Sequence, residues 1–175
     1  MMMTRRELSE FETLVMPHLD AAHNLARWLL RDPIVTEDVV QTAIVRALTY
    51  FSGFRAENPR AWLLQIVRNA AHGWLADQSG KRHQPWPDGE DDERDQLPDP
   101  SPGPEAEAAG REALGRLDEV LATMPIDLRE CLILREVEDL SYREIAEITG
   151  APIGTVMSRL WRARQWMMPR MEGML

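Results

Sequence analysis

A proline-rich, acidic segment near the middle of the chain constrains the fold more than any other sequence feature. Six of the twelve prolines lie between Pro85 and Pro104, and residues 85–113 carry ten acidic side chains against two basic ones. Proline removes backbone donors and blocks helix formation, while clustered carboxylates repel one another. The segment cannot bury enough apolar surface to fold alone, so we interpret residues 85–112 as a flexible linker between two domains.

On either side of this linker, apolar residues recur at spacings of three and four, which is the period of amphipathic helices. Aromatic and β-branched residues do not alternate with polar ones over any long stretch. The chain is therefore predicted to be all-α, with two small helical domains at residues 5–84 and 113–172.

Three helices are expected in the first domain. One apolar stripe runs from Phe11 to Leu29 and ends at a break at Asp32-Pro33. Thr36 is expected to cap the second helix, and Pro59 occupies the first position of the third.

Composition excludes several function classes. The single cysteine permits neither an internal disulfide nor a CxxC metal pair, and we find no phosphate-binding loop or catalytic pair of acid and base. We therefore expect no enzymatic activity, no cofactor and no metal. No apolar run approaches the ~18 residues that span a bilayer, and the N-terminus lacks the apolar core of a signal peptide, so we expect a cytoplasmic protein without membrane insertion.

Residues 140–164 read LSYREIAEITGAPIGTVMSRLWRAR, two short helical patterns joined by a turn. Ser141 and Glu144 have the spacing of a capping box, Gly150 suits a left-handed helix end, and Pro152 opens the next helix. The inner face of that second helix is expected to hold Ile153, Val156, Leu160 and Ala163. Two short helices around such a turn are typical of a helix-turn-helix.

Charge supports nucleic-acid binding by this motif but does not decide it. Nearly all of the net charge of −9 belongs to the linker, whereas residues 153–170 contain four arginines and no acid. Arginine can bond guanine edges or clamp phosphates. From the pattern alone, a DNA reader and a solvated helical hairpin both remain open.

The stretch resembles the promoter-reading domain of extracytoplasmic-function (ECF) sigma factors, and MPIDLRECLILREVEDLSY resembles the segment before it. The N-terminal half matches the same family in FETLVMPHLDAAHNLARWLLRDP, TEDVVQTAIVRALTYF and FRAENPRAWLLQIVRNAAHGWL. The resemblance covers most of the chain apart from the linker. It implies a specificity subunit that binds core RNA polymerase, recognises two promoter elements and helps to melt the upstream edge of the bubble.

The resemblance also implies site residues. The helix from Thr36 to Phe51 would contact the clamp helices of core polymerase through Asp38, Gln41 and Arg46, with Thr42 standing where the family usually has glutamate. The melting element and its flipped base would be contacted by Arg55, Asn58, Asn69, His72, Lys81 and Arg82. Trp62 and Trp74 lie on the apolar stripe, so core packing is favoured over base stacking for them.

In the second domain, the resemblance implies that the second helix of the motif reads bases through Thr155, Ser158, Arg159 and Arg162. The start of the preceding helix would touch phosphates through Ser141, Tyr142 and Arg143. Met157 stands where the family commonly has a cation, which predicts one phosphate contact fewer.

Further partners follow from the resemblance. Promoter DNA, core polymerase and an anti-sigma factor are expected. The linker is either a plain tether or an occupant of a basic polymerase channel. The competing interpretation is a stand-alone helix-turn-helix regulator, which would bind DNA without recruiting polymerase.

Overall fold

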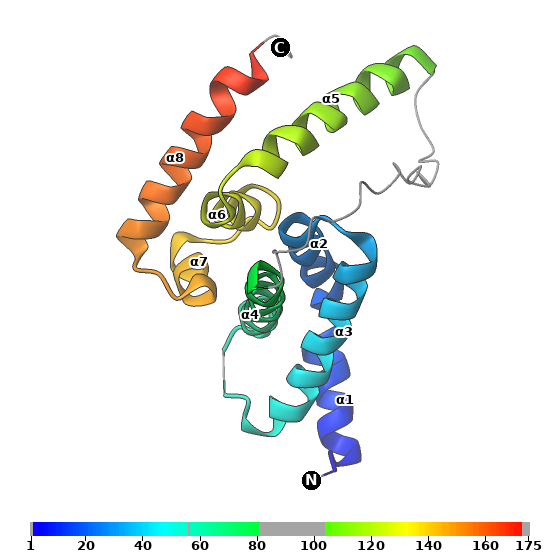
Figure 1. Cartoon of the computed structure of the whole chain (residues 1–175). Helices are drawn as coiled ribbons and strands as arrows, with labels where there is room; N and C mark the ends of the chain where they lie inside the picture. Colours follow the sequence, from blue (N-terminus) through cyan, green and yellow to red (C-terminus); the bar gives the residue numbers. More distant parts are fainter. Residues whose placement is uncertain (1, 56, 81–103, 173–175) are drawn as a thin grey trace.

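The computed structural model describes residues 2–55, 57–80 and 104–172, and all the regular structure within them is helical (Figure 1). The helices are α1 (Arg5–Leu14), α2 (Leu19–Leu30), α3 (Pro33–Tyr50), α4 (Pro59–Gly80), α5 (Pro104–Thr123), α6 (Ile126–Glu136), α7 (Tyr142–Thr149) and α8 (Ile153–Met171). Short 3-10 turns cover Met16–His18 and Phe51–Gly53. The expected all-α class is confirmed over these residues.

The first domain contains four helices, so the prediction of three was wrong. The apolar stripe from Phe11 to Leu29 faces the core except at Leu14, which is 40% exposed, and it spans two helices. Pro17 lies in the 3-10 turn between them, where it cannot donate the backbone hydrogen bond that a continuous helix would need. The stripe persists because both helices pack on the same core.

The cap of α3 also differs from the prediction. Asp32 caps this helix, because its carboxylate accepts hydrogen bonds from the backbone N–H groups of Ile34 (2.9 Å) and Val35 (3.2 Å). Pro33 takes the first helical position, where no backbone donor is needed. Thr36 therefore lies inside the first turn and is fully buried.

The helix that precedes α6 begins earlier than expected. Helix α5 starts at Pro104, so residues 104–112, which were assigned to the linker, are helical. Proline is favoured at a helix start, and Glu105 and Glu107 in the first turn complement the helix dipole. The remainder of the predicted linker, residues 85–103, lies outside the described residues.

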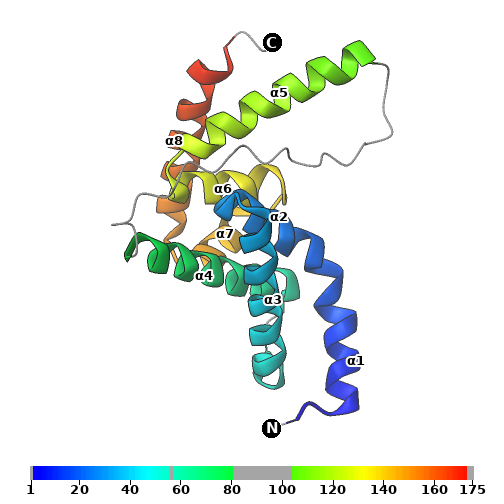
Figure 2. The same cartoon turned by 45° about the vertical axis from the view of Figure 1, so that its right-hand side comes forward.

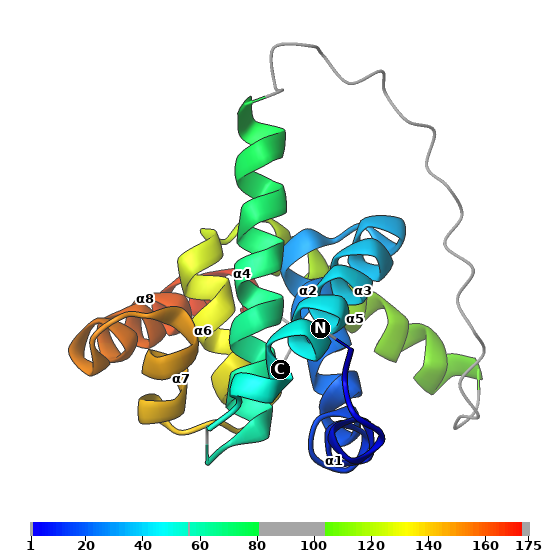
Figure 3. The same cartoon turned by 90° about the horizontal axis from the view of Figure 1, so that it is seen from below.

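The two domains pack against each other through α4. One side of this helix contacts α2 and α3, and its other side contacts α7, while α2 also contacts α6. Figure 3 shows α4 standing between these two groups of helices. Helix α5 projects away from the packed helices, as Figure 2 shows. The two domains are therefore in direct contact.

Candidate functional site

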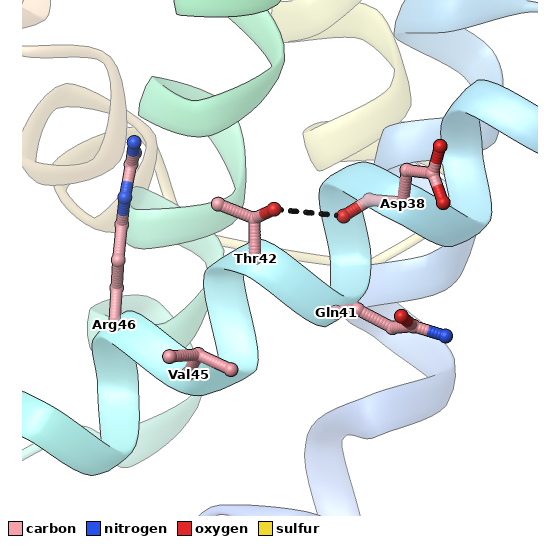
Figure 4. Close-up of a pocket in the computed structure, with 5 residues that line it drawn as sticks. All are labelled: Asp38, Gln41, Thr42, Val45 and Arg46. Atoms are coloured by element: carbon pink, nitrogen blue, oxygen red, sulfur yellow. Dashed lines mark hydrogen bonds between the residues drawn. The ribbon is translucent and has the colours of Figure 1, made fainter.

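The outward face of α3 brings the four predicted polymerase-contact residues together. Val39, Val40, Ala43 and Ala47 are buried on the inner face of the helix. The helical period therefore turns Asp38, Gln41, Thr42 and Arg46 to solvent, where with Val45 they line a shallow hollow (Figure 4). The Thr42 hydroxyl donates to the backbone carbonyl of Asp38 at 2.9 Å, so it is occupied within its own helix.

Val45 is the member of this face that sequence reasoning missed. Its side chain is 61% exposed among polar neighbours. A single exposed apolar side chain is common on protein surfaces, but its setting among polar groups matches the apolar centre and polar rim of a small protein interface. The signal was present in the sequence, because Val45 is four residues after Gln41 and so lies on the same face.

The helix-turn-helix forms as predicted. The backbone N–H of Ser141 donates to Glu144 Oε2 at 2.7 Å, and the backbone N–H of Glu144 donates to Ser141 Oγ at 3.1 Å. The hydrogen bond from Ser141 lowers the pKa of Glu144 despite partial burial, so this carboxylate is ionised at neutral pH. Gly150 ends α7 in the left-handed conformation with φ of 71°. These local bonds fix where α7 begins and ends, and hence where α8 starts.

Helix α8 buries Val156, Leu160 and Ala163, as expected. Ile153 was expected on this inner face, but it is 47% exposed because the first turn of α8 extends beyond the core. The outward face holds Met157, Ser158, Trp161, Arg162 and Gln165, all exposed.

Two of the predicted base contacts, Thr155 and Arg159, are only half-exposed. The Arg159 guanidinium lies close to the buried Cys131 thiol. Burial raises the pKa of that thiol to about 11, although Arg159 opposes the rise. Ser158 and Arg162 are therefore the predicted base contacts that the fold leaves most accessible.

The three predicted phosphate contacts lie together at the start of α7. Arg143 is exposed and 3.9 Å from Glu147 one turn later. The Ser141 hydroxyl oxygen already accepts the capping bond, and Tyr142 is half-buried beneath the Arg135 guanidinium, 5.0 Å from its ring centre. Arg143 is thus the residue here whose charged end lies at the surface, where it pairs with Glu147.

The predicted melting residues are not gathered on one open surface. Arg55 and Asn69 are exposed, whereas Asn58 and His72 face the second domain. Asn58 Nδ2 donates to Glu144 Oε1 at 2.8 Å, and His72 Nε2 lies 2.9 Å from Glu130 Oε2. Lys81 and Arg82 lie outside the described residues.

The aromatic residues beside this element form a packed cluster. Phe54 stacks on Phe51 with ring centres 5.5 Å apart, and Trp62 approaches Phe54 to 4.8 Å. Phe11 closes the cluster with an edge contact to Phe51 at 5.3 Å. Trp62 therefore packs with the core, as its place in the apolar stripe indicated.

Within the described ranges, no group of three or more His, Cys, Asp or Glu side chains is arranged to hold a metal ion. The same residues include no helix that is long and apolar enough to cross a membrane.

Comparisons with known proteins identify both halves of the chain. Residues 14–80 match the family described as Sigma-70 region 2, and residues 114–167 match Sigma-70, region 4. The ECF RNA polymerase sigma-E factor of Haemophilus influenzae is 35% identical over 150 residues, which cover 81% of this chain and 76% of that protein. The RNA polymerase sigma-H factor of Pseudomonas aeruginosa is 30% identical over 165 residues, covering 92% and 86%.

Solved structures show the same fold. The sigma factor RpoE of Bartonella quintana, in complex with the anti-sigma factor NepR, superposes with a TM-score of 0.75 at 23% identity, covering 94% of this chain and 98% of that one. CnrH, in complex with the cytosolic domain of CnrY, gives a TM-score of 0.62 at 24% identity, with coverage of 89% and 83%.

Proposed function

The chain belongs to the extracytoplasmic-function sigma factors of RNA polymerase. We propose that different surfaces of the chain carry out polymerase binding, promoter recognition and promoter melting. The first domain binds core polymerase and the upstream edge of the promoter bubble. The second domain reads the more distant promoter element. The protein has no chemistry of its own and acts in the cytoplasm, where polymerase and promoters are found.

The outward face of α3 is the polymerase-binding surface in this proposal. Asp38, Gln41 and Arg46 present polar groups around the exposed methyl groups of Val45. Protein interfaces commonly combine a small apolar centre with a polar rim. Thr42 offers no carboxylate there, and its hydroxyl bonds its own helix, so the contact depends on the neighbouring side chains.

The outward face of α8 reads the distant element, and this face is the observation that carries the proposal. In a helix-turn-helix the second helix enters the major groove with its N-terminal part against base edges. Ser158 and Arg162 are exposed there, and residues 153–171 include no acidic side chain to repel DNA. Arg143, at the start of α7, is placed to hold a backbone phosphate.

Helix α4 and the loop before it contact the melted element. Arg55 and Asn69 are exposed. Asn58 and His72 bond to the second domain in this structure, so they become available to DNA when that domain moves away. Extruding a base costs a few kcal/mol, so polar groups that hold the extruded base are required. An anti-sigma factor is a further partner, as it is for the relative from Bartonella quintana.

Mapping of transcription start sites tests the function. Genomic DNA fragments would be transcribed by core polymerase with and without the purified chain, and the 5′ ends of the products sequenced. We expect new start sites that share two upstream sequence elements. Binding to DNA without any new start site would instead support the stand-alone regulator.

A further inference from the structure

A carboxylate of the second domain lies between the Arg68 guanidinium and the His72 imidazole of α4. Arg68 Nε donates to Glu130 Oε1 at 2.5 Å, and His72 Nε2 lies 2.9 Å from Glu130 Oε2. Arg68 and His72 are one helical turn apart, so they present their nitrogen atoms on one face. Both oxygens of a single carboxylate are thus engaged by α4.

The same pattern recurs two turns earlier on α4. Arg60 Nη2 donates to the backbone carbonyl of Glu138 and, at 3.0 Å, to Glu138 Oε2. Asn58, just before α4, makes a third contact with a carboxylate of the second domain through its bond to Glu144. Arg60 and Arg68 are the two Lys or Arg residues among residues 59–80, and both are bonded to carboxylates from the other domain.

Glu130 is charged although its side chain has no exposed surface. Burial by itself would raise the pKa of this carboxyl, but the hydrogen bonds from His72 and Arg68 outweigh burial and lower it. A buried carboxylate depends on such partners, because the uncompensated charge would be costly. The Glu130 carboxylate therefore forms a specific anionic contact with α4.

The acidity of this part of the second domain is unusual for a DNA-binding unit. Residues 126–149 carry seven acidic side chains and three arginines. The interface also leaves buried polar atoms without a hydrogen-bond partner, namely Arg31 Nη1, Arg129 Nε and Glu138 Oε1. Unpaired buried groups weaken a contact. An interface of this kind can separate more easily than a fully paired one.

We propose that Arg60 and Arg68 are DNA phosphate ligands, and that Glu130 and Glu138 take the place of phosphates when the two domains are packed together. This inference rests on the proposed role of α4 in promoter binding. Arginine bonds carboxylate and phosphate oxygens through the same donors and with similar geometry. From Arg60 to His72 the helix rises about 18 Å, a length over which a DNA strand presents several phosphates.

Competition follows from this arrangement. DNA and the second domain cannot occupy Arg60 and Arg68 at the same time, so the packed form binds DNA through α4 only after the domains part. The apparent affinity for DNA is then reduced by the fraction of molecules that are closed. A change that weakens the closed form without altering α4 should strengthen DNA binding.

The test compares Glu130→Gln, Arg68→Ala and the double variant in the full chain. Each is measured by sedimentation velocity and by binding to a fluorescein-labelled 20-nucleotide single-stranded DNA of mixed sequence. We expect E130Q to sediment more slowly and to bind this DNA about tenfold more tightly, because a hydrogen bond to a charged group is lost from the closed form only. Adding R68A to E130Q should remove most of that gain and reduce the salt slope by about 0.7.

A control variant and a second pair of variants accompany this comparison. Arg6 and Glu10 form an exposed pair at 3.0 Å on α1, so R6A/E10Q removes similar groups without touching the interface and should change neither measurement. If E130Q impairs folding, as seen by circular dichroism, Glu138→Gln with and without Arg60→Ala provides the same comparison at a more exposed pair.

Two results would overturn the proposal. Unchanged sedimentation and DNA affinity in the folded glutamine variant would show that the carboxylate does not keep the arginine from DNA. Equal affinity of the glutamine variant with and without the arginine would show that the arginine is no DNA ligand. The assay contains no polymerase, so its failure is separate from a failure of the start-site mapping.

Discussion

Arg162 and Arg164 on α8 allow a matched test of the DNA-reading surface. Each substitution by alanine removes one positive charge from the same helix. Arg162 is exposed, and its described bond is a long one of 3.5 Å from Nε to the Ser158 carbonyl. Arg164 instead donates to Glu136 on α6 at 3.1 Å. The two variants therefore share their charge change and differ in the surface they affect.

We expect Arg162→Ala to weaken promoter binding by about 1–3 kcal/mol, a factor of about 5 to 150, if its guanidinium bonds a base edge. A phosphate contact would instead appear as a smaller loss that is uniform across sequences, with the salt slope lower by about one. Arg164→Ala should lower promoter binding less than Arg162→Ala, because Arg164 bonds the Glu136 and Tyr142 side chains and does not stand on the groove-facing side. Its exposed ion pair is worth at most about 1 kcal/mol, so the fold should survive.

The assay is run-off transcription by core polymerase with each variant, together with promoter binding across a salt series. The start sites mapped for the unaltered chain supply the promoter. Equal losses of promoter binding and transcription for Arg162→Ala and Arg164→Ala would refute the assignment of the outward face of α8 to DNA reading. Such losses would reflect the total charge of the helix and not its groove-facing side.

Three further outcomes are expected. The folded pKa of Glu130 is below the ordinary value of 4.5, so its contribution to stability is complete above that value and is lost as pH falls through the folded pKa. In urea unfolding below pH 5, the free energy of unfolding should therefore fall more steeply with pH in the unaltered chain than in E130Q. With its pKa at about 11, the buried Cys131 thiol should resist iodoacetamide at pH 8 until urea is added, and equal rates in both states would contradict its burial. Asp32→Ala should lower the free energy of unfolding by about 1 kcal/mol through loss of the α3 cap, while Thr13→Ala, at an exposed site on α1, should change it far less.

Local features of the chain could be predicted because their causes are local. The capping box of Ser141 and Glu144, the left-handed Gly150 and the helix start at Pro59 each depend on residues within one turn. The buried face of α3 follows the helical period, whereas Asp38, Gln41, Thr42 and Arg46 were singled out by the family resemblance. Where two local signals compete, prediction was weaker: Asp32 and Thr36 are both capping residues, and the choice between them depended on which one the core buries.

The sequence by itself therefore determined the all-α class, most of the apolar faces, the helix-turn-helix and the exposed positions of Ser158 and Arg162 on α8. Only the tertiary structure decided which surfaces remain open. Contacts such as Arg68 with Glu130, 62 residues apart, depend on how two domains fit together, and no periodic pattern encodes that fit. A glutamate within an apolar run has no evident partner in the sequence, yet its buried charge requires one. That requirement links α4 to the second domain and covers residues that the sequence alone placed on a free surface.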